Sequence, residues 1–193
     1  MSLQAVAALT QRITVRRNAV VCAAGVCCFA AAMVLSAHVR IPLTFSPVPL
    51  TLQTMIVLLS GAALGAWGGA ASQALYLAAG AAGLPVFTSG GGFAAFAGPT
   101  AGYLLAFPLA AWLMGRAMGS DRRWAAPVAA AGGALLIELL GAGWLVAGCH
   151  QALGTALMLG VVPFLAGDAL KVAAVTALAR PSRRAYRTAA GLH

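Results

Sequence analysis

Arginine occurs in this chain as three short clusters, separated by long stretches that carry almost no charge. Three arginines lie within residues 12–17, three within 116–123 and four within 180–187. The stretches between them are apolar, and several approach the ~20 residues that a helix needs to cross a bilayer. Because 62% of the chain is hydrophobic and only 8% is charged, we predict an integral membrane protein rather than a soluble domain.

The apolar runs predict an all-α, polytopic membrane protein with six transmembrane helices. The expected spans are residues 19–37, 51–66, 69–84, 101–118, 125–148 and 154–179. They form a membrane domain over 19–179, between an amphipathic lead-in at 1–18 and a basic tail at 180–193. Six spans put all three arginine clusters on one side, so the positive-inside rule predicts that both termini are cytoplasmic. The expected location is the bacterial cytoplasmic (inner) membrane.

Two connections are long, uncharged or nearly so, and predicted to face outward. Residues 38–50 contain Pro42, Pro47 and Pro49 and therefore cannot form a regular helix. Residues 85–100 combine glycines with aromatic side chains, which is typical of a loop that folds onto a neighbouring surface. Both loops would cover the outer end of the helices.

The sixth apolar run contains an acid and a base, Asp168 and Lys171. A spacing of three residues places them on one face of a helix. Each charge costs at least ~2.5–3.5 kcal/mol at membrane depth unless it finds a partner. The residues alone leave two interpretations open: an ion pair that joins helices, or a polar anchor for a solute.

Composition and motifs argue against several other functions. The net charge of +9 comes from residues beside apolar runs, which is typical of cytoplasmic membrane flanks and not of a nucleic-acid surface. The single lysine does not follow a glycine in a P-loop, so no ATP site of that kind is expected. No nucleophile–base set or clustered metal ligands are visible, so we predict neither catalysis nor a metal or cofactor.

The first span carries small residues four positions apart. They are Ala19, Ala23, Cys27 and Ala31. Such a row lets another helix approach closely, although an alanine-rich helix can also show this spacing by chance.

Four segments of the chain form a pattern: Pro47–Thr54, Gly83–Phe87, Gly98–Leu104 and Gly167–Lys171. Together they resemble the BioY family, the biotin-binding S components of energy-coupling-factor (ECF) transporters. The likeness extends over residues 19–179, with the segments in the family's order.

The resemblance implies a six-helix bundle that binds biotin beneath its outer loops and delivers it with a transmembrane T component and two ATPase subunits. In that family the small-residue face of the first span contacts the T component, which here would be the row from Ala19 to Ala31. Two positions depart from the family pattern: Ala101 stands where a second glycine is usual, and Glu138 is less expected in the fifth span.

A physical argument supports biotin separately. Its ureido ring offers N–H donors beside a carbonyl acceptor, which Asp168 and Lys171 complement. We expect the bicycle to lie against Phe93 and Tyr103, with the charged valerate tail nearer the outer loops and water. The competing pose places the carboxylate on Lys171.

Further candidate contacts each have a structural alternative. Gln53 would contact ligand or cap a helix, Ser89 would bond ligand or its own turn, and Phe93 would line the pocket or pack within its loop. Tyr103 would face the pocket or the interfacial aromatic belt. Glu138 would pair with Lys171, contact ligand or be protonated toward lipid.

Three rival functions stay open from the sequence. The chain could transport biotin alone or as a homo-oligomer, without ATPase partners. It could bind another vitamin within the same family, or it could be a structural membrane protein in which Asp168 and Lys171 only join helices.

Overall fold

The computed structural model describes residues 3–120 and 122–191, with side chains described from Asn18 onward. The chain is almost entirely helical, as predicted. Its elements are α1 (Leu3–His38), β1 (Arg40–Ile41), β2 (Leu50–Thr51), α2 (Gln53–Ala81), the 3₁₀ helix η1 (Phe93–Phe96), α3 (Ala101–Ala117), α4 (Ala125–Ala147), α5 (Leu153–Gly160) and α6 (Leu165–Ala190).

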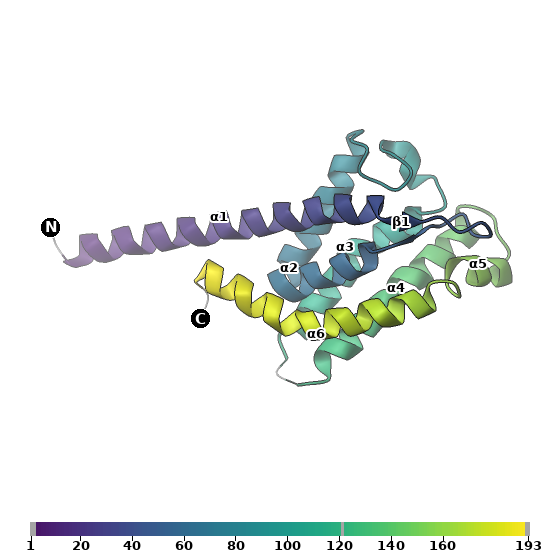
Figure 1. Ribbon diagram of the computed structural model, residues 1–193. Coiled ribbons are helices and arrows are strands. Elements are labelled where there is room, and N and C mark those ends of the chain that lie inside the picture. Colours follow the sequence, from purple (N-terminus) through teal and green to yellow (C-terminus); the bar gives the residue numbers. More distant parts are fainter. Residues whose placement is uncertain (1–2, 121, 192–193) are drawn as a thin grey trace.

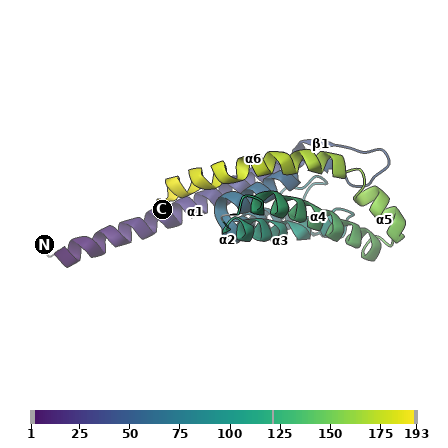
Figure 2. The same ribbon diagram turned by 90° about the horizontal axis from the view of Figure 1, so that it is seen from below.

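The helices form a bundle whose two ends differ. Both chain termini lie at one end, where α1 extends well beyond the other helices (Figure 1). The β1 strand and the short helix α5 lie at the opposite end, and the view turned by 90° agrees (Figure 2). This arrangement is the one expected for an even number of crossings, and it gathers the connections 38–50, 85–100 and 148–152 away from the termini.

The α2 helix is a tight hairpin and not one straight rod. Gly65 has φ 79° and ψ −179°, a conformation that essentially only glycine adopts. The chain reverses there, so that Gln73 Nε2 donates to Ser60 Oγ at 3.0 Å. A Cβ on Gly69 would lie 2.6 Å from Gly61 Cα. The first arm (residues 53–64) and the second arm (66–81) therefore correspond to the predicted second and third spans.

The predicted sixth span, residues 154–179, is wrong as a continuous helix. It is divided into α5 and α6, which are bent by 51° at the break. Pro163 lies in that break and has no backbone N–H with which to continue the helix. The break places Asp168 in the first turn of α6, where the positive end of the helix dipole favours a carboxylate.

The α6 helix also extends further than predicted. It continues through Pro181 into the basic tail and ends at Gly191, whose φ of 66° is left-handed. At the other end of the chain, the backbone of the lead-in is continuous with the first span in α1.

Within the described residues, three helical segments are long and apolar enough to cross a membrane. They are residues 18–38, α2 and α4, with α5 and α6 together as a fourth span if the bent pair is counted as one. The α3 helix has 17 residues, at the lower limit for a span. The arms of α2, at about 12 and 16 residues, are only about 18 and 24 Å long.

The two predicted outer loops have short regular elements. The Pro-rich loop is a β-hairpin in which Arg40 pairs with Thr51 and Ile41 pairs with Leu50. The Gly-rich loop makes a tight turn between Phe87 and Gly90 before it forms η1. Both loops lie over the ends of α2, α3 and α6, where they close the site described next.

Candidate functional site

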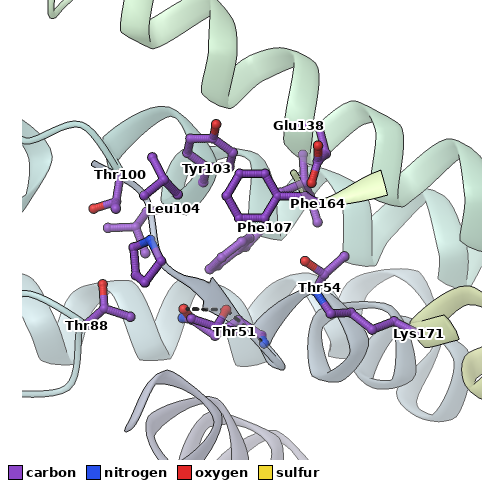
Figure 3. Close-up of a pocket in the computed structure, with 14 residues that line it drawn as sticks. Thr51, Thr54, Thr88, Thr100, Tyr103, Leu104, Phe107, Glu138, Phe164 and Lys171 are labelled. Atoms are coloured by element: carbon purple, nitrogen blue, oxygen red, sulfur yellow. Dashed lines mark hydrogen bonds between the residues drawn. The ribbon is translucent and has the colours of Figure 1, made fainter. Parts of the chain in front are cut away.

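A cavity lies where the outer loops meet the ends of four helices, and we call it the inner cavity. Its volume is about 40 Å³, enough for a few water molecules and below the usual range for small-molecule sites. Its walls come from both loops and from α2, α3, α4 and α6 (Figure 3). The lining residues are Val48, Pro49, Thr51, Gln53, Thr54, Thr88, Thr100, Tyr103, Leu104, Phe107, Ile137, Glu138, Phe164 and Lys171.

Of the predicted acid–base pair, Lys171 lines this cavity, and Asp168 contacts Lys171 without lining it. Lys171 Nζ donates to Asp168 Oδ1 at 2.7 Å, and the two side chains are 7% and 8% exposed. The second oxygen of Asp168, Oδ2, is buried without a hydrogen-bond partner in the described part of the chain. Lys171 itself faces the cavity, so the pair combines a helix-internal contact with access to a solute.

Glu138 brings a third ionisable group to the same place from α4. Its side chain lines the inner cavity, and the residue is only 4% exposed. It interacts with the carboxyl group of Asp168 and with the charge of Lys171. Among the residues that the structure describes, its Oε2 atom has no hydrogen-bond partner. Two carboxyl groups and one ammonium group therefore share a buried corner.

Gln53 lines the inner cavity and also joins the arms of α2. Its Nε2 donates to Tyr76 Oη at 2.9 Å, and Tyr76 Oη donates to Val86 O at 3.1 Å. The residue therefore connects the cavity to the second arm and to the start of the Gly-rich loop. The alternative of a helix cap is not supported, because α2 begins without a side-chain cap bond in the described structure.

Tyr103 lies in the cavity wall and not at an exposed helix end. It is 8% exposed, and its hydroxyl donates to Gly160 O at 2.7 Å, which fixes the end of α5. Its ring lies 6.4 Å from that of Phe164. These two rings, with Phe107, form an apolar surface opposite the charged corner.

Four threonines line the inner cavity and were not singled out from the sequence: Thr51, Thr54, Thr88 and Thr100. The sequence favours Thr100 as a cap for α3, yet its side chain makes no such bond in the described coordinates. Nothing in the sequence distinguishes a threonine whose hydroxyl lines a cavity from a threonine whose hydroxyl caps a helix. The Pro and Gly patterns predict the two loops, and three of the four threonines lie in or beside those loops. The loop patterns were therefore the sequence signal that could have pointed to these threonines.

A second, outer cavity adjoins the first and contains Ser89. The two share Pro49, Thr88 and Thr100 in their walls. The outer cavity is larger, about 330 Å³, and Arg40 also lines it. The Arg40 guanidinium donates to Thr88 O, so this cation joins the two outer loops. Ser89 thus lies at the outer cavity, separate from Asp168 and Lys171.

The structure does not bring Phe93 to either cavity. Phe93 is 79% exposed and packs only against Phe96 among the described aromatic rings, at 6.3 Å between ring centres. The predicted pocket wall is formed instead by Phe107 and Phe164, which are 3% and 5% exposed. The loop Phe residues could not be distinguished from helix Phe residues in the sequence.

The predicted partner-facing row on α1 lies on an open surface. All four members are exposed: Ala19, Ala23, Cys27 and Ala31. In contrast, Met33 and Ala37, further along α1, are fully buried. The part of α1 near the terminal end therefore presents small side chains outward. Within the described residues, no group of three or more His, Cys, Asp or Glu side chains could hold a metal ion.

A helical membrane bundle with a buried, partly charged cavity beneath two loops defines a membrane protein that can hold a small solute. Comparison with known proteins assigns the family. A family model described as the BioY family matches residues 8–188, so the chain belongs to the BioY family.

Individual relatives agree with this assignment. The chain is 39% identical over 180 residues to the biotin transporter BioY of Rhodobacter capsulatus, covering 84% of this chain and 92% of that protein. It is 38% identical over 145 residues to the probable biotin transporter BioY of Pyrococcus horikoshii, covering 75% and 86%. Among solved structures, it is similar to the S-component for biotin from an ECF-type ABC transporter, with a TM-score of 0.75, 27% identity and 95% of each chain covered.

These findings confirm the resemblance seen in the four sequence segments and the prediction of an all-α membrane fold. Together with the apolar helices, they place the chain in the cytoplasmic (inner) membrane as a multi-pass protein. Membership of a transporter family also makes it a transport and binding protein rather than an enzyme. The side of the membrane on which the termini lie stays a prediction.

Proposed function

We propose that this chain is the substrate-binding membrane subunit of a biotin uptake system. The observation that carries the proposal is the inner cavity beneath the outer loops, where the ammonium group of a buried ion pair lies in the wall and a larger outer cavity adjoins. Relatives covering most of the chain are named biotin transporters, and biotin has the hydrogen-bonding groups that such a corner complements.

In the proposed complex the ureido ring lies at the charged corner. Asp168 accepts a hydrogen bond from a ureido N–H, and Lys171 donates to the ureido carbonyl. The apolar bicycle packs against Tyr103, as expected from the sequence, and against Phe107 and Phe164. These two rings replace the expected contact with Phe93. A ligand that is neutral at this end adds no net charge to a site that already contains three ionisable groups.

The valerate tail then points toward the outer cavity. Arg40 lines that cavity, and a guanidinium pairs well with a carboxylate. Ser89 and the shared threonines supply further hydroxyl groups along the path. Desolvating the carboxylate is less costly here, since the outer cavity is closer to water.

Comparison of biotin with its carboxamide tests this orientation. The amide removes the charge of the tail and leaves the ureido ring intact, so the proposed pose predicts only a modest loss of affinity, about tenfold or less. A much larger loss that persists in Arg40→Met would favour the reversed pose with the carboxylate on Lys171.

The proposal includes partner subunits that supply energy. The sequence has no P-loop in which its single lysine could serve, and the similar solved structure is described as part of an ECF-type ABC transporter. We therefore assign ATP hydrolysis to two ATPase subunits and coupling to a transmembrane T component. Biotin uptake by cells that express the chain with and without these subunits tests the assignment. Equal uptake in both would favour a solitary or oligomeric transporter.

A further inference from the structure

A third hollow of the bundle lies between α3 and α4, and we call it the lateral groove. Its walls come from the end of α3, the connection that follows and the first half of α4. Its volume is about 680 Å³, larger than that of the inner or the outer cavity. It shares no lining residue with either cavity, so it is a separate feature at the opposite end of α3.

Apolar and small side chains line most of the lateral groove. Val128 is 59% exposed and Leu113 is 39% exposed, although both are hydrophobic. A Cβ on Gly132 would meet no described heavy atom within 4 Å, so the groove is open at this point of α4. Leu136 lies about 16 Å along α4 from Ala125, close to the ~15 Å hydrocarbon depth of one leaflet. These dimensions fit an acyl chain.

The end of the groove beside the α3–α4 connection is polar and cationic. Arg122 and Ser120 line it, and none of the described lining residues is acidic. Arg122 Cζ lies 5.2 Å from the ring centre of Trp124, an aromatic side chain of the kind that marks the membrane interface. Arg180 Nη2 of α6 donates to Arg122 O at 3.3 Å, which brings a second guanidinium group to the connection. The charge here is complementary to an anionic headgroup.

The small residues of α4 favour a lipid over a second helix as the occupant. Ala125, Ala129 and Gly133 are four positions apart, a spacing that admits a helix where it is free. Ala125 and Gly133 are buried, however, and a Cβ on Gly133 would lie 2.5 Å from Leu58 Cδ2. This row is therefore already used in packing within the bundle, and the open part of the groove lies over Val128 and Gly132.

We propose that the lateral groove binds one anionic phospholipid, with an acyl chain along α4 and the phosphate on Arg122. The Ser120 hydroxyl donates a further hydrogen bond to the headgroup. The apolar part of the groove accepts any phospholipid of suitable length, so the preference for a negative headgroup comes from Arg122. This site does not depend on the proposed function.

Native mass spectrometry of the purified protein tests the headgroup preference with two probes that both carry two oleoyl chains. Phosphatidylglycerol is anionic and phosphatidylcholine is zwitterionic. The first phosphatidylglycerol should bind wild type about fivefold more tightly, the factor that one cation contributes at a membrane surface. Arg122→Gln should remove this preference. Arg123→Gln is the matched control, because Arg123 is exposed in the same connection without lining the groove, and it should keep most of the preference.

Gly132→Leu tests the acyl part of the site. The leucine side chain fills the open part of the groove, so the first molecule of both lipids should bind about tenfold more weakly, with their ratio unchanged. Gly143→Leu is the control: it also meets open space and lies on α4 outside the groove. Both lipids should bind this control as they bind wild type.

Equal binding of the two lipids by wild type, or equal losses in Arg122→Gln and Arg123→Gln, would overturn the proposal. Dimers that Gly132→Leu abolishes, without any preference between the lipids, would assign the groove to a second copy of the chain instead. If Gly132→Leu does not fold, the comparison of the two arginine variants decides the question by itself.

Discussion

Lys171 and Asp168 combine two roles that their sequence spacing could not separate. Their 2.7 Å contact lies within α6, whereas the structural interpretation expected an ion pair that joins two helices. The position of Lys171 in the wall of the inner cavity is what a solute anchor requires. Burying such a pair contributes little stability by itself, whereas removing one partner leaves the other charge uncompensated. Stability and binding should therefore respond differently to substitution.

Lys171→Met should lower the free energy of unfolding by about 3–5 kcal/mol, since it leaves buried carboxylates without a cation. It should also abolish biotin binding. In the double variant Lys171→Met/Asp168→Leu, much of the stability should return but binding should not. Thermal unfolding in detergent and equilibrium binding measure the two effects. Recovery of binding together with stability would show that the pair only joins helices.

The α2 hairpin shows how a single residue defines an element. The apolar runs 51–66 and 69–84 were predicted as separate spans on length and glycine content, and the reversal at Gly65 lies at the end of the first run. The short arms suit this fold because hydrogen bonds cross between them. Gln73 Nε2 reaches Ser60 and Gln53 Nε2 reaches Tyr76, so both buried amide nitrogens find partners inside the hairpin. Gln73 Oε1 is buried without a partner among the described residues.

Gly65→Ala should destabilise the fold by about 1–3 kcal/mol, because a Cβ is strained at a φ of 79° and ψ of −179°. Space is not the cause, since a Cβ there meets no described heavy atom within 4 Å. Gly143→Ala is the matched control: it also has open space but lies inside the regular α4 helix. The control should be neutral or slightly stabilising. Equal thermal unfolding of both variants would contradict the strained turn.

The break in the sixth span could not be predicted from hydropathy. Hydropathy across residues 154–179 is continuous, so the run favours one helix even though Pro163 lies within it. Proline can kink a membrane helix or end it, and only the surrounding packing decides which. Here Tyr103 and Phe164 lie beside the break, and the resulting bend brings Asp168 to a helix start.

At the scale of the whole molecule, charge and hydropathy patterns predicted more of the fold than of the cavity. The arginine clusters and apolar runs are local signals, and they predicted the helical class and the loops that cover the site. The six crossings stay a prediction, because three helices of the described chain, or four with the bent pair, are long and apolar enough to span a membrane. The walls of the cavity depend on which residues meet in three dimensions. Phe107, Phe164 and four threonines therefore went unnoticed, and Phe93 was wrongly expected in the pocket wall.

The exposed row of small residues on α1 allows a prediction about assembly. Ala23→Trp should prevent association with the T component by filling the surface along which a helix would pack, and it should leave biotin binding unchanged, because Ala23 is exposed and lies outside the inner cavity. Co-purification with the T component measures the effect. Cys28→Trp is the control: Cys28 is exposed but lies about 140° around the helix from Ala23.

Equilibrium binding of purified protein to a panel of vitamins tests the central claim most directly. The account predicts saturable binding of biotin at one site per chain, competition by desthiobiotin, which keeps the ureido ring, and no competition by thiamine or riboflavin. Absence of saturable biotin binding, or tighter binding of another vitamin at this site, would contradict it.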